Sequence, residues 1–483
     1  MTASRIRIPS TALRLTAAVS LALAASTTLA AQVSLSGLPD LAGGALFSEG
    51  RAVSDDGTVV VGRSSSAAST SNNDEGVRWS GGNTLALGDL PGGEYSSVAR
   101  GVSADGTLTV GSSRAKHTGW SFAQWRACTW TATGQQTELP NLAGVDQETT
   151  HAYAASADGA VIVGMSGGTA TVNSAVAVRW TSNGAEALGW LPTNNESRAY
   201  DVSDDGTVIV GTATGGGPDH AFRWVEGVGL TDLGANTTAE AVSADGTWVV
   251  GTLAGGEAGR WSAAGGWQSL GSDFTPRGIS ADGNVVVGTQ TGPGFGFAVI
   301  WTPAGGERNL IEVVEGEWGH GLGGWTLGLG WDVSPDGTQI VGRGKNPSNQ
   351  SEGFHLELPR EPWTAFGGGL AGGAGTPTLH GTGSLLVGTP IKLKIAAAPH
   401  NAPVFLVVGS TTVFLPLAGG TLVPSLDLVL GGLATGNQGT LNINGTWPTD
   451  IPAGLELYVQ AWMIDATGPE GYSATNGLGM VVP

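Results

Sequence analysis

The stretch VSDDGTVIVG, residues 202–211, carries the strongest fold signal in the chain. Copies of this V-S-x-D-G-x-x-x-V-G motif recur seven times, and the Asp of each Asp-Gly pair stands at Asp56, Asp105, Asp158, Asp205, Asp245, Asp282 and Asp336. Asp-Gly between two apolar runs predicts a β-hairpin with a two-residue turn, because glycine accepts a positive φ. Seven such hairpins, 37 to 54 residues apart, indicate a repeat fold.

Two further strands are predicted after each hairpin. The third ends near a recurring Trp, at Trp79, Trp130, Trp180, Trp224, Trp261 and Trp301, with Leu356 in the seventh copy. The fourth carries a Leu-Gly or Leu-Pro pair in five copies and a weaker match at Leu310 in a sixth. The missing copy stands at the N-terminus, where LPDLAG (38–43) matches LPNLAG (139–144). We therefore predict an all-β fold, a seven-bladed β-propeller of four-stranded blades over residues 31–358 that an N-terminal strand closes. An open β-solenoid is the rival fold, but it does not need that displaced strand.

These units resemble the HAF family of extracellular repeats. The family is named for a His-Ala-Phe run, present here at His220-Ala221-Phe222 and followed by Arg223-Trp224. The hairpin, Arg-Trp and Leu-Gly elements recur in order from about residue 35 to residue 358. The resemblance implies secretion and a propeller-type repeat, and it implies no particular activity.

Residues 1–30 are predicted to be a secretory signal. Basic residues at Arg5, Arg7 and Arg14 precede a short apolar core, and small residues allow cleavage after Ala30 or Ala31. No later segment is long and apolar enough to cross a bilayer, so we expect no transmembrane segment after signal removal. The predicted location is secreted or cell surface, with the periplasm also compatible. The single cysteine, Cys128, forms no internal disulfide and is expected to be buried and inert.

The chain is acidic, with a formal net charge of −19. A nucleic-acid partner needs a basic face to neutralise phosphates, and none is visible, so nucleic acid is excluded as a partner. The same charge argues against docking on anionic membranes.

A second domain is predicted after the propeller. Residues 359–375 are rich in Gly and Pro and are interpreted as a linker. Residues 376–483 hold about seven short alternating runs, the first at Leu385–Val387, which predict a small C-terminal β-sandwich. Its end is similar to C-terminal modules of secreted bacterial proteins, on the motifs at 462–465 and 473–476, and the resemblance implies export, attachment or spacing. An insertion at 315–331, rich in Gly and Trp, is either a packing lid or an aromatic binding ledge.

One constellation suggests a ligand site. Three residues before each motif Ser lies a variable position, occupied by Arg51, Arg100, Tyr153, Tyr200, Glu240, Arg277 and Trp331. The first strand of a propeller blade lines the central channel, so these side chains are predicted to ring one channel mouth and bind a ligand. In the rival interpretation they only plug the channel. Preceding loops add Glu49, Glu94, Glu148, His151, Glu196 and Arg198 to the predicted rim.

The sequence predicts a secreted, non-catalytic binding or surface-associated protein with an extracellular partner, either a glycan or a protein. The alternative is a carbohydrate-active hydrolase or lyase at the channel mouth, for which His151, Tyr153, Tyr200 and Arg198 form the only candidate set. Phosphate-loop and dinucleotide fingerprints are absent in their proper context, and the seven His residues show no zinc-ligand spacing, so neither a cofactor nor a metal is expected.

Overall fold

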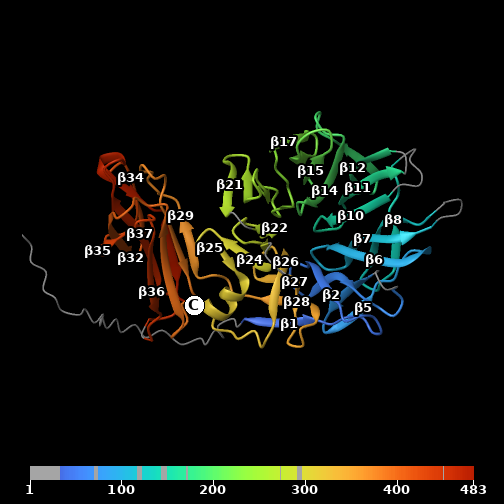
Figure 1. The fold of residues 1–483 in the computed structure, drawn as a ribbon, viewed down its shortest axis with the longest axis horizontal. Helices are drawn as coiled ribbons and strands as arrows, with labels where there is room; N and C mark the ends of the chain where they lie inside the picture. Colours follow the sequence, from blue (N-terminus) through green and yellow to red (C-terminus); the bar gives the residue numbers. More distant parts are fainter. Residues whose placement is uncertain are drawn as a thin grey trace, which may run out of the picture. The chain divides into compact units, whose positions relative to one another are not determined.

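The computed structural model describes residues 33–69, 74–116, 122–142, 149–169, 172–271, 274–290, 296–449 and 451–483. Up to residue 357, the described residues form seven four-stranded antiparallel sheets, each a meander in chain order apart from one that recruits β1. The sheets follow one another around a common centre (Figure 1), which is the arrangement of a β-propeller. The predicted signal, residues 1–30, lies outside the described residues.

The first four sheets are β2 (Ser48–Val53), β3 (Val59–Ser64), β4 (Glu75–Ser80) and β5 (Asn83–Ala86); β6 (Gly92–Val102), β7 (Leu108–Ala115), β8 (Gln124–Thr131) and β9 (Gln136–Glu138); β10 (Thr149–Ala155), β11 (Ile162–Thr169), β12 (Val172–Thr181) and β13 (Gly184–Gly189); and β14 (Glu196–Val202), β15 (Val208–Thr214), β16 (His220–Val225) and β17 (Gly229–Ala235). The other three are β18 (Ala241–Val242), β19 (Trp248–Thr252), β20 (Ala258–Ser262) and β21 (Gly266–Gly271); β22 (Phe274–Ile279), β23 (Val286–Gln290), β24 (Phe297–Thr302) and β25 (Gly306–Asn309); and β26 (Thr326–Val333), β27 (Gln339–Lys345) and β28 (Ser351–Glu357) with β1 (Ser34–Leu38).

The Asp-Gly motif forms the predicted hairpin, but its turn is longer than two residues. Ser54 pairs with Val59 through a backbone hydrogen bond of 2.9 Å, so the loop spans four residues. Asp56 Oδ1 accepts hydrogen bonds from Ser54 Oγ (2.8 Å) and from the backbone N–H of Thr58 (2.9 Å). Gly57 has a φ of 72°, which favours glycine. The Ser–Asp bond recurs in all seven copies, so the Asp stabilises the loop as an acceptor.

The N-terminal segment joins the last sheet, as the displaced repeat element predicts. Strand β1 pairs antiparallel with β28, with Leu38 opposite Gly353. A further bridge joins Phe47, the residue before β2, to Ser351 at the start of β28. The chain therefore pairs with the last sheet both before and after the loop that connects β1 to β2.

Two tryptophans of the predicted insertion pack against the core, and one of them, Trp318, also lines a hollow. The insertion begins with a single helical turn, η1 (Glu312–Glu317). Trp318 and Trp325 lie against a buried cluster that includes Leu310 and Leu327. Trp331 is different, because it belongs to β26 and lies at the channel.

The C-terminal part forms three further sheets. A six-stranded sheet contains β29 (Trp363–Phe366), β39 (Gly477–Val481), β37 (Glu456–Ile464), β32 (Pro403–Gly409) and β35 (Leu428–Ala434), with β38 (Tyr472–Ala474) beside β37. The others are β30 (Thr378–Thr382), β31 (Pro390–Ala396) and β36 (Leu441–Thr446), and the hairpin of β33 (Thr412–Leu417) and β34 (Gly420–Pro424). A single turn, η2 (Pro469–Gly471), precedes β38.

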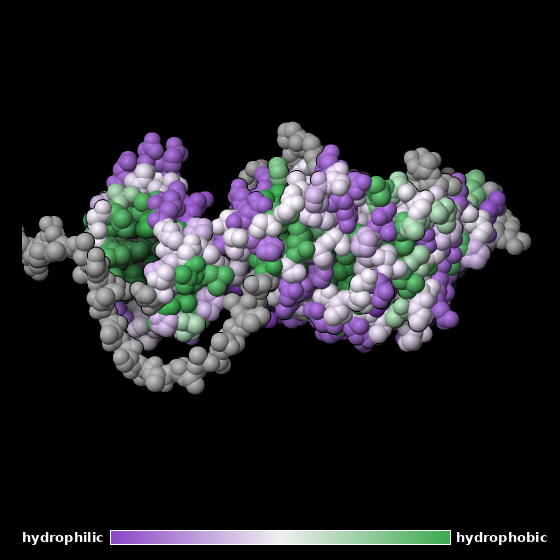
Figure 2. Space-filling model, turned by 90° about the horizontal axis from the view of Figure 1, so that it is seen from below, coloured by the Kyte–Doolittle hydropathy of each residue, from purple (hydrophilic) through white to green (hydrophobic). Residues whose placement is uncertain are grey.

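Two expectations for this region are wrong. The predicted linker contains β29, because Trp363 is buried and its indole N–H donates to the carbonyl of Gly383 (2.7 Å). Residues 385–387 form no strand, and Leu385 has a φ of 56° that interrupts extended pairing. Many of the exposed large apolar side chains lie on β33 and β35, and hydrophobic areas are visible on the C-terminal part at the left of Figure 2.

Candidate site at the channel mouth

The seven predicted ring residues lie together. Arg51, Arg100, Tyr153, Tyr200, Glu240, Arg277 and Trp331 all line one cavity of about 180 Å³. Six of them belong to the first strands of six sheets, and Glu240 directly precedes β18 in the seventh. The motif spacing thus identified one equivalent position in each sheet. That these residues bind a ligand stays a prediction.

A β-bulge turns the ring position toward the channel. In six of the seven sheets the register between the first and second strands shifts across the ring residue, as between Gly50 and Ala52 around Arg51. The closing Gly of the motif has no side chain, so the backbone of the bulged first strand can approach it closely. A Cβ on Gly62 would lie 1.9 Å from the carbonyl oxygen of Glu49. Bulges commonly aim side chains beside functional sites.

One side of the mouth is built around a buried carboxylate. Glu49 is fully buried and binds three guanidinium groups, those of Arg51 (2.8 Å), Arg63 (3.1 Å) and Arg343 (3.2 Å). Burial alone would raise the pKa of Glu49, but the three guanidinium groups outweigh it and hold that pKa below its usual value. Arg63 also binds Asp74 (2.9 Å).

Trp331 lies between two cations. The guanidinium carbons of Arg51 and Arg277 lie 4.8 and 5.1 Å from the centre of its ring. Arg277 also binds Glu240 (3.0 Å). Within the described residues, Trp331 Nε1 and Arg51 Nε are buried donors that find no acceptor.

The opposite side carries the His and Tyr residues. Arg100 Nη1 donates to Ser112 Oγ (2.6 Å), and that hydroxyl bonds to His151 Nδ1 (2.8 Å). The ring of Tyr153 lies 6.0 Å from that of His151 and 5.5 Å from that of Tyr200, centre to centre. Burial, with added repulsion from nearby arginines, lowers the pKa of His151 to about 3, so its ring is neutral at pH 7.

The phenols and Arg198 complete this side. Burial raises the pKa of Tyr153, and burial together with the nearby Glu240 raises that of Tyr200 to about 12. Arg198 binds Glu196 (3.1 Å) and lies close enough to Tyr200 to affect its pKa. The proposed set of His151, Tyr153, Tyr200 and Arg198 is therefore gathered in one place.

Arg100 is a cation without a carboxylate partner. Among the described residues no Asp or Glu forms an ion pair with it, and its contacts are the hydroxyl of Ser112 and the ring of Tyr153, 5.4 Å from its guanidinium carbon. Burial lowers the pKa of Arg100 to about 10, so it stays charged at neutral pH.

Some site residues were not predicted from the sequence. Arg63, Ser112 and Arg343 each follow the closing Gly of a motif copy, so the position after that Gly on the second strand was the available signal. Asp201 and Asp332, one residue after the ring position, also line the cavity. Of the predicted rim, Glu94 lies outward and pairs with Arg114 (3.5 Å), and Glu148 lies outside the described residues.

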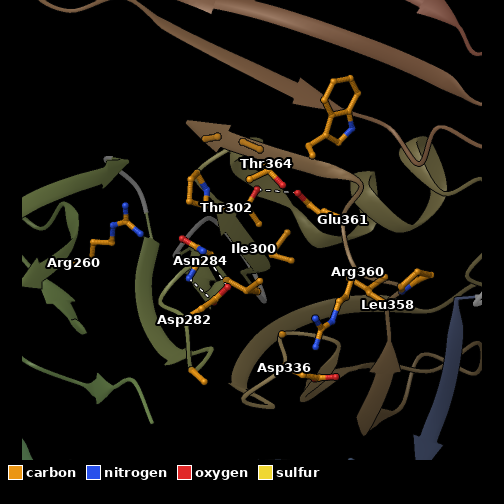
Figure 3. A pocket seen from close by; sticks show the side chains of 18 of the residues that line it. Arg260, Asp282, Asn284, Ile300, Thr302, Asp336, Leu358, Arg360, Glu361 and Thr364 are labelled. Carbon is orange, nitrogen blue, oxygen red and sulfur yellow. Dashed lines mark hydrogen bonds between the residues drawn. The ribbon is translucent and has the colours of Figure 1, made fainter. Parts of the chain in front are cut away.

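A larger hollow of about 800 Å³ lies between the hairpin loops at Asp282 and Asp336 and the segment 358–367 (Figure 3). Its polar groups are largely engaged with one another. Asp282 accepts from Asn284 (3.0 Å), Thr302 donates to Glu361 (3.0 Å), and Arg260 donates to the carbonyl of Gly283 (2.9 Å). The mouth ring, with its unpaired donors, is the better candidate site.

Three further features bear on function. Cys128 is fully buried, and burial raises its thiol pKa far above the usual value. In the part of the chain that the structure describes, no group of three His, Cys, Asp or Glu side chains is placed to hold a metal ion. The described helices are two single turns, and neither has the length or hydropathy of a bilayer-spanning segment.

A scan against models of known protein families finds no match, and neither does a search of curated proteins. Among solved structures, the chain matches TolB from Acinetobacter baumannii with a TM-score of 0.37 and 13% identity, over 51% of this chain and 62% of that one. It matches a structure from a study of two prolyl endopeptidases with a TM-score of 0.39 and 11% identity, over 77% of this chain and 56% of that one. The chain thus spans less than two thirds of either protein. At these TM-scores the likenesses add nothing to what the strand pairing shows, and the HAF resemblance stays a prediction.

Proposed function

We propose that this protein is a secreted, seven-bladed β-propeller of HAF type that binds an extracellular ligand at one mouth of its central channel. The seven four-stranded sheets are its blades, and the β1–β28 pair closes the ring. The C-terminal sheets, which include β29, form a β-sandwich that attaches or spaces the propeller. Secretion rests on the predicted signal, and sequencing the N-terminus of the exported protein tests it, with Ala31 or Gln32 expected first.

The observation that carries the binding proposal is the convergence of seven unlike side chains on one cavity. A channel that needed only filling would be served by apolar residues, since burying charged groups costs free energy. Here cations, a carboxylate and aromatic rings meet at the same level, and two buried donors find no acceptor among the described residues. Concave sites with a few convergent polar groups are typical of ligand binding.

The proposal is tested by ligand binding with ring variants. The purified protein is applied to a glycan and polysaccharide array beside a Tyr153→Phe/Tyr200→Phe variant. The matched control is Tyr472→Phe, which changes an exposed tyrosine of the C-terminal part. We expect the double variant to weaken binding and the control to leave it unchanged. Equal binding by all three proteins would place the ligand elsewhere.

A second candidate function is a polysaccharide lyase, favoured by the gathered His151, Tyr153, Tyr200 and Arg198. A hydrolase of the two-carboxylate type is less well supported, because the three carboxyl groups that line the cavity are engaged. Arg277 binds Glu240, and Asp201 and Asp332 each accept two backbone N–H groups. In β-elimination a base removes the proton beside a sugar carboxylate. The glycosidic oxygen departs and takes a proton from an acid, and a carbon–carbon double bond forms. Neutral His151 would be the base, Tyr153 or Tyr200 the acid, and Arg198 would hold the carboxylate.

The two candidates differ in turnover. A lyase releases unsaturated sugars, whose new double bond absorbs ultraviolet light. Turnover that is lost in His151→Ala and in Tyr153→Phe/Tyr200→Phe would establish the enzyme. Ring-dependent binding without this absorbance would establish the binding protein.

A further inference from the structure

We propose that the ligand of the channel mouth is an acidic polysaccharide, one anionic sugar of which enters the cavity and pairs with Arg100. This inference rests on the proposed function and names its ligand class.

The first support is the charge at the mouth. The ring and the residues bound to it contribute six guanidinium groups, those of Arg51, Arg63, Arg100, Arg198, Arg277 and Arg343. Their ion-pair partners are four carboxylates, those of Glu49, Asp74, Glu196 and Glu240. Three of these guanidinium groups line the cavity itself, those of Arg51, Arg100 and Arg277, beside the carboxyls of Glu240, Asp201 and Asp332. Burial raises the pKa of Asp201 to about 7 and that of Asp332 to about 6, so near neutral pH these two carboxyls are only partly ionised. An anionic group that enters the cavity would therefore meet three cations, in a chain whose net charge is −19.

The second support is the imbalance of donors and acceptors. Trp331 Nε1 and Arg51 Nε find no acceptor among the described residues, and the guanidinium of Arg100 has no carboxylate partner there. The planar guanidinium matches the paired oxygens of a carboxylate or a sulfate. A ligand rich in acceptor oxygens would satisfy these groups, whereas a neutral apolar ligand would leave them buried and unpaired.

The third support is the size and lining of the cavity. Its volume of about 180 Å³ is below the roughly 300–1,000 Å³ of pockets that enclose a whole drug-sized ligand, so it suits one unit of a longer chain. The ring of Trp331 is already contacted by the guanidinium groups of Arg51 and Arg277. Two phenols, those of Tyr153 and Tyr200, also line the cavity. Their hydroxyls are suited to sugar hydroxyls, which a plain anion lacks.

The test uses matched probes and the whole protein. Polygalacturonate is compared with its fully methyl-esterified form, and dextran sulfate with dextran, so that each pair differs only in charge. Polyglutamate serves as a polyanion without sugar rings. Each probe is titrated against the wild type, Arg100→Gln, Arg100→Lys and Arg179→Gln. Arg179 on β12 is the control, because it pairs with Glu186 and Glu226 and none of these three residues lines the cavity.

We expect the wild type to bind polygalacturonate or dextran sulfate and neither neutral counterpart nor polyglutamate. Binding of polygalacturonate would identify a carboxylate as the recognised group, and binding of dextran sulfate would identify a sulfate. Arg100→Gln should weaken binding by about 10- to 100-fold, the loss typical of a charge-assisted hydrogen bond. The affinity of Arg100→Lys should lie between those of the wild type and Arg100→Gln. Arg179→Gln should bind like the wild type. Arg100→Gln removes a cation without a carboxylate partner, so its melting temperature should not fall.

Other outcomes separate this inference from the proposed function. Equal binding of neutral and acidic probes, lost in Arg100→Gln, would overturn the acidic class and leave the mouth as the site. Binding of polyglutamate as tight as that of the sugars, or no binding of any acidic probe, would also overturn the inference. Binding of an acidic probe that neither Arg100→Gln nor Tyr153→Phe/Tyr200→Phe changes would overturn both.

Discussion

Asp332 on the last sheet binds Val53 on the first. Its Oδ2 accepts the backbone N–H of Val53 (3.1 Å), while its Oδ1 accepts that of Val333 (2.8 Å). Asp201 repeats this arrangement between two inner sheets, with Val242 and Val202 as donors at 2.8 and 2.9 Å. A buried carboxyl thus joins neighbouring sheets at the seam where the first and last sheets meet.

Loss of this seam contact should destabilise the protein. Asp332→Ala leaves two buried backbone N–H groups without their acceptor, at a cost of about 1–3 kcal/mol. Asp219→Ala, a change at an exposed side chain, is the control. Chemical denaturation at pH 5 measures the difference, and equal stability of both variants would show that the seam bond contributes nothing.

Stability should also depend on pH through these carboxyls. Burial raises the pKa of Asp201 to about 7 and that of Asp332 to about 6, above the usual 3.8. Between pH 4 and pH 7 the native state therefore binds more protons than the unfolded state, so the free energy of unfolding falls as pH rises. The slope is at most about 1.4 kcal/mol per pH unit for each group.

Denaturation of the wild type and of Asp201→Asn at pH 4, 5, 6 and 7 checks this dependence. The stability of the wild type relative to the variant should decline across that range. A constant difference would show that Asp201 has an ordinary pKa in the folded protein.

The closing Gly of the motif should not tolerate a methyl group. A Cβ on Gly211 would lie 1.9 Å from the carbonyl oxygen of Arg198, and the backbone of a bulged strand cannot easily move. We expect Gly211→Ala to cost about 2 kcal/mol or more. Gly321→Ala is the control, since its Cβ would meet nothing within 4 Å. A similar melting temperature for both variants would contradict the bulge geometry.

The thiol of Cys128 should report global unfolding. It is fully buried, and its raised pKa keeps it protonated and unreactive. A thiol reagent should label no cysteine in the native protein and one per chain in denaturant. Rapid labelling without denaturant would mean that the sheet of β6–β9 opens locally.

The repeat motif made much of the propeller predictable. Asp-Gly fixes the loop and the closing Gly fixes the register, so counting back from Ser203 located Tyr200 in the ring. The four-residue loop was missed, because it depends on side-chain hydrogen bonds. The Ser203 hydroxyl accepts the backbone N–H of Val208 and donates to the carboxylate of Asp205. The strand at Trp363 was missed, since flanking glycines and prolines hide a short apolar run.

The composition of the site was only partly predictable. The position of Arg100 follows from the motif, but its lack of a carboxylate partner depends on which side chains neighbouring sheets bring near it. Arg63 and Arg343 lie far apart in sequence and meet at Glu49 only because the last sheet packs against the first. No periodicity within one repeat contains that information.

The most direct test of the central claim is the affinity of the purified protein for an acidic polysaccharide, measured beside Arg100→Gln and Arg179→Gln. We predict that Arg100→Gln weakens binding by about 10- to 100-fold while Arg179→Gln leaves it unchanged. Equal affinity of all three proteins would contradict the pairing of the ligand with Arg100.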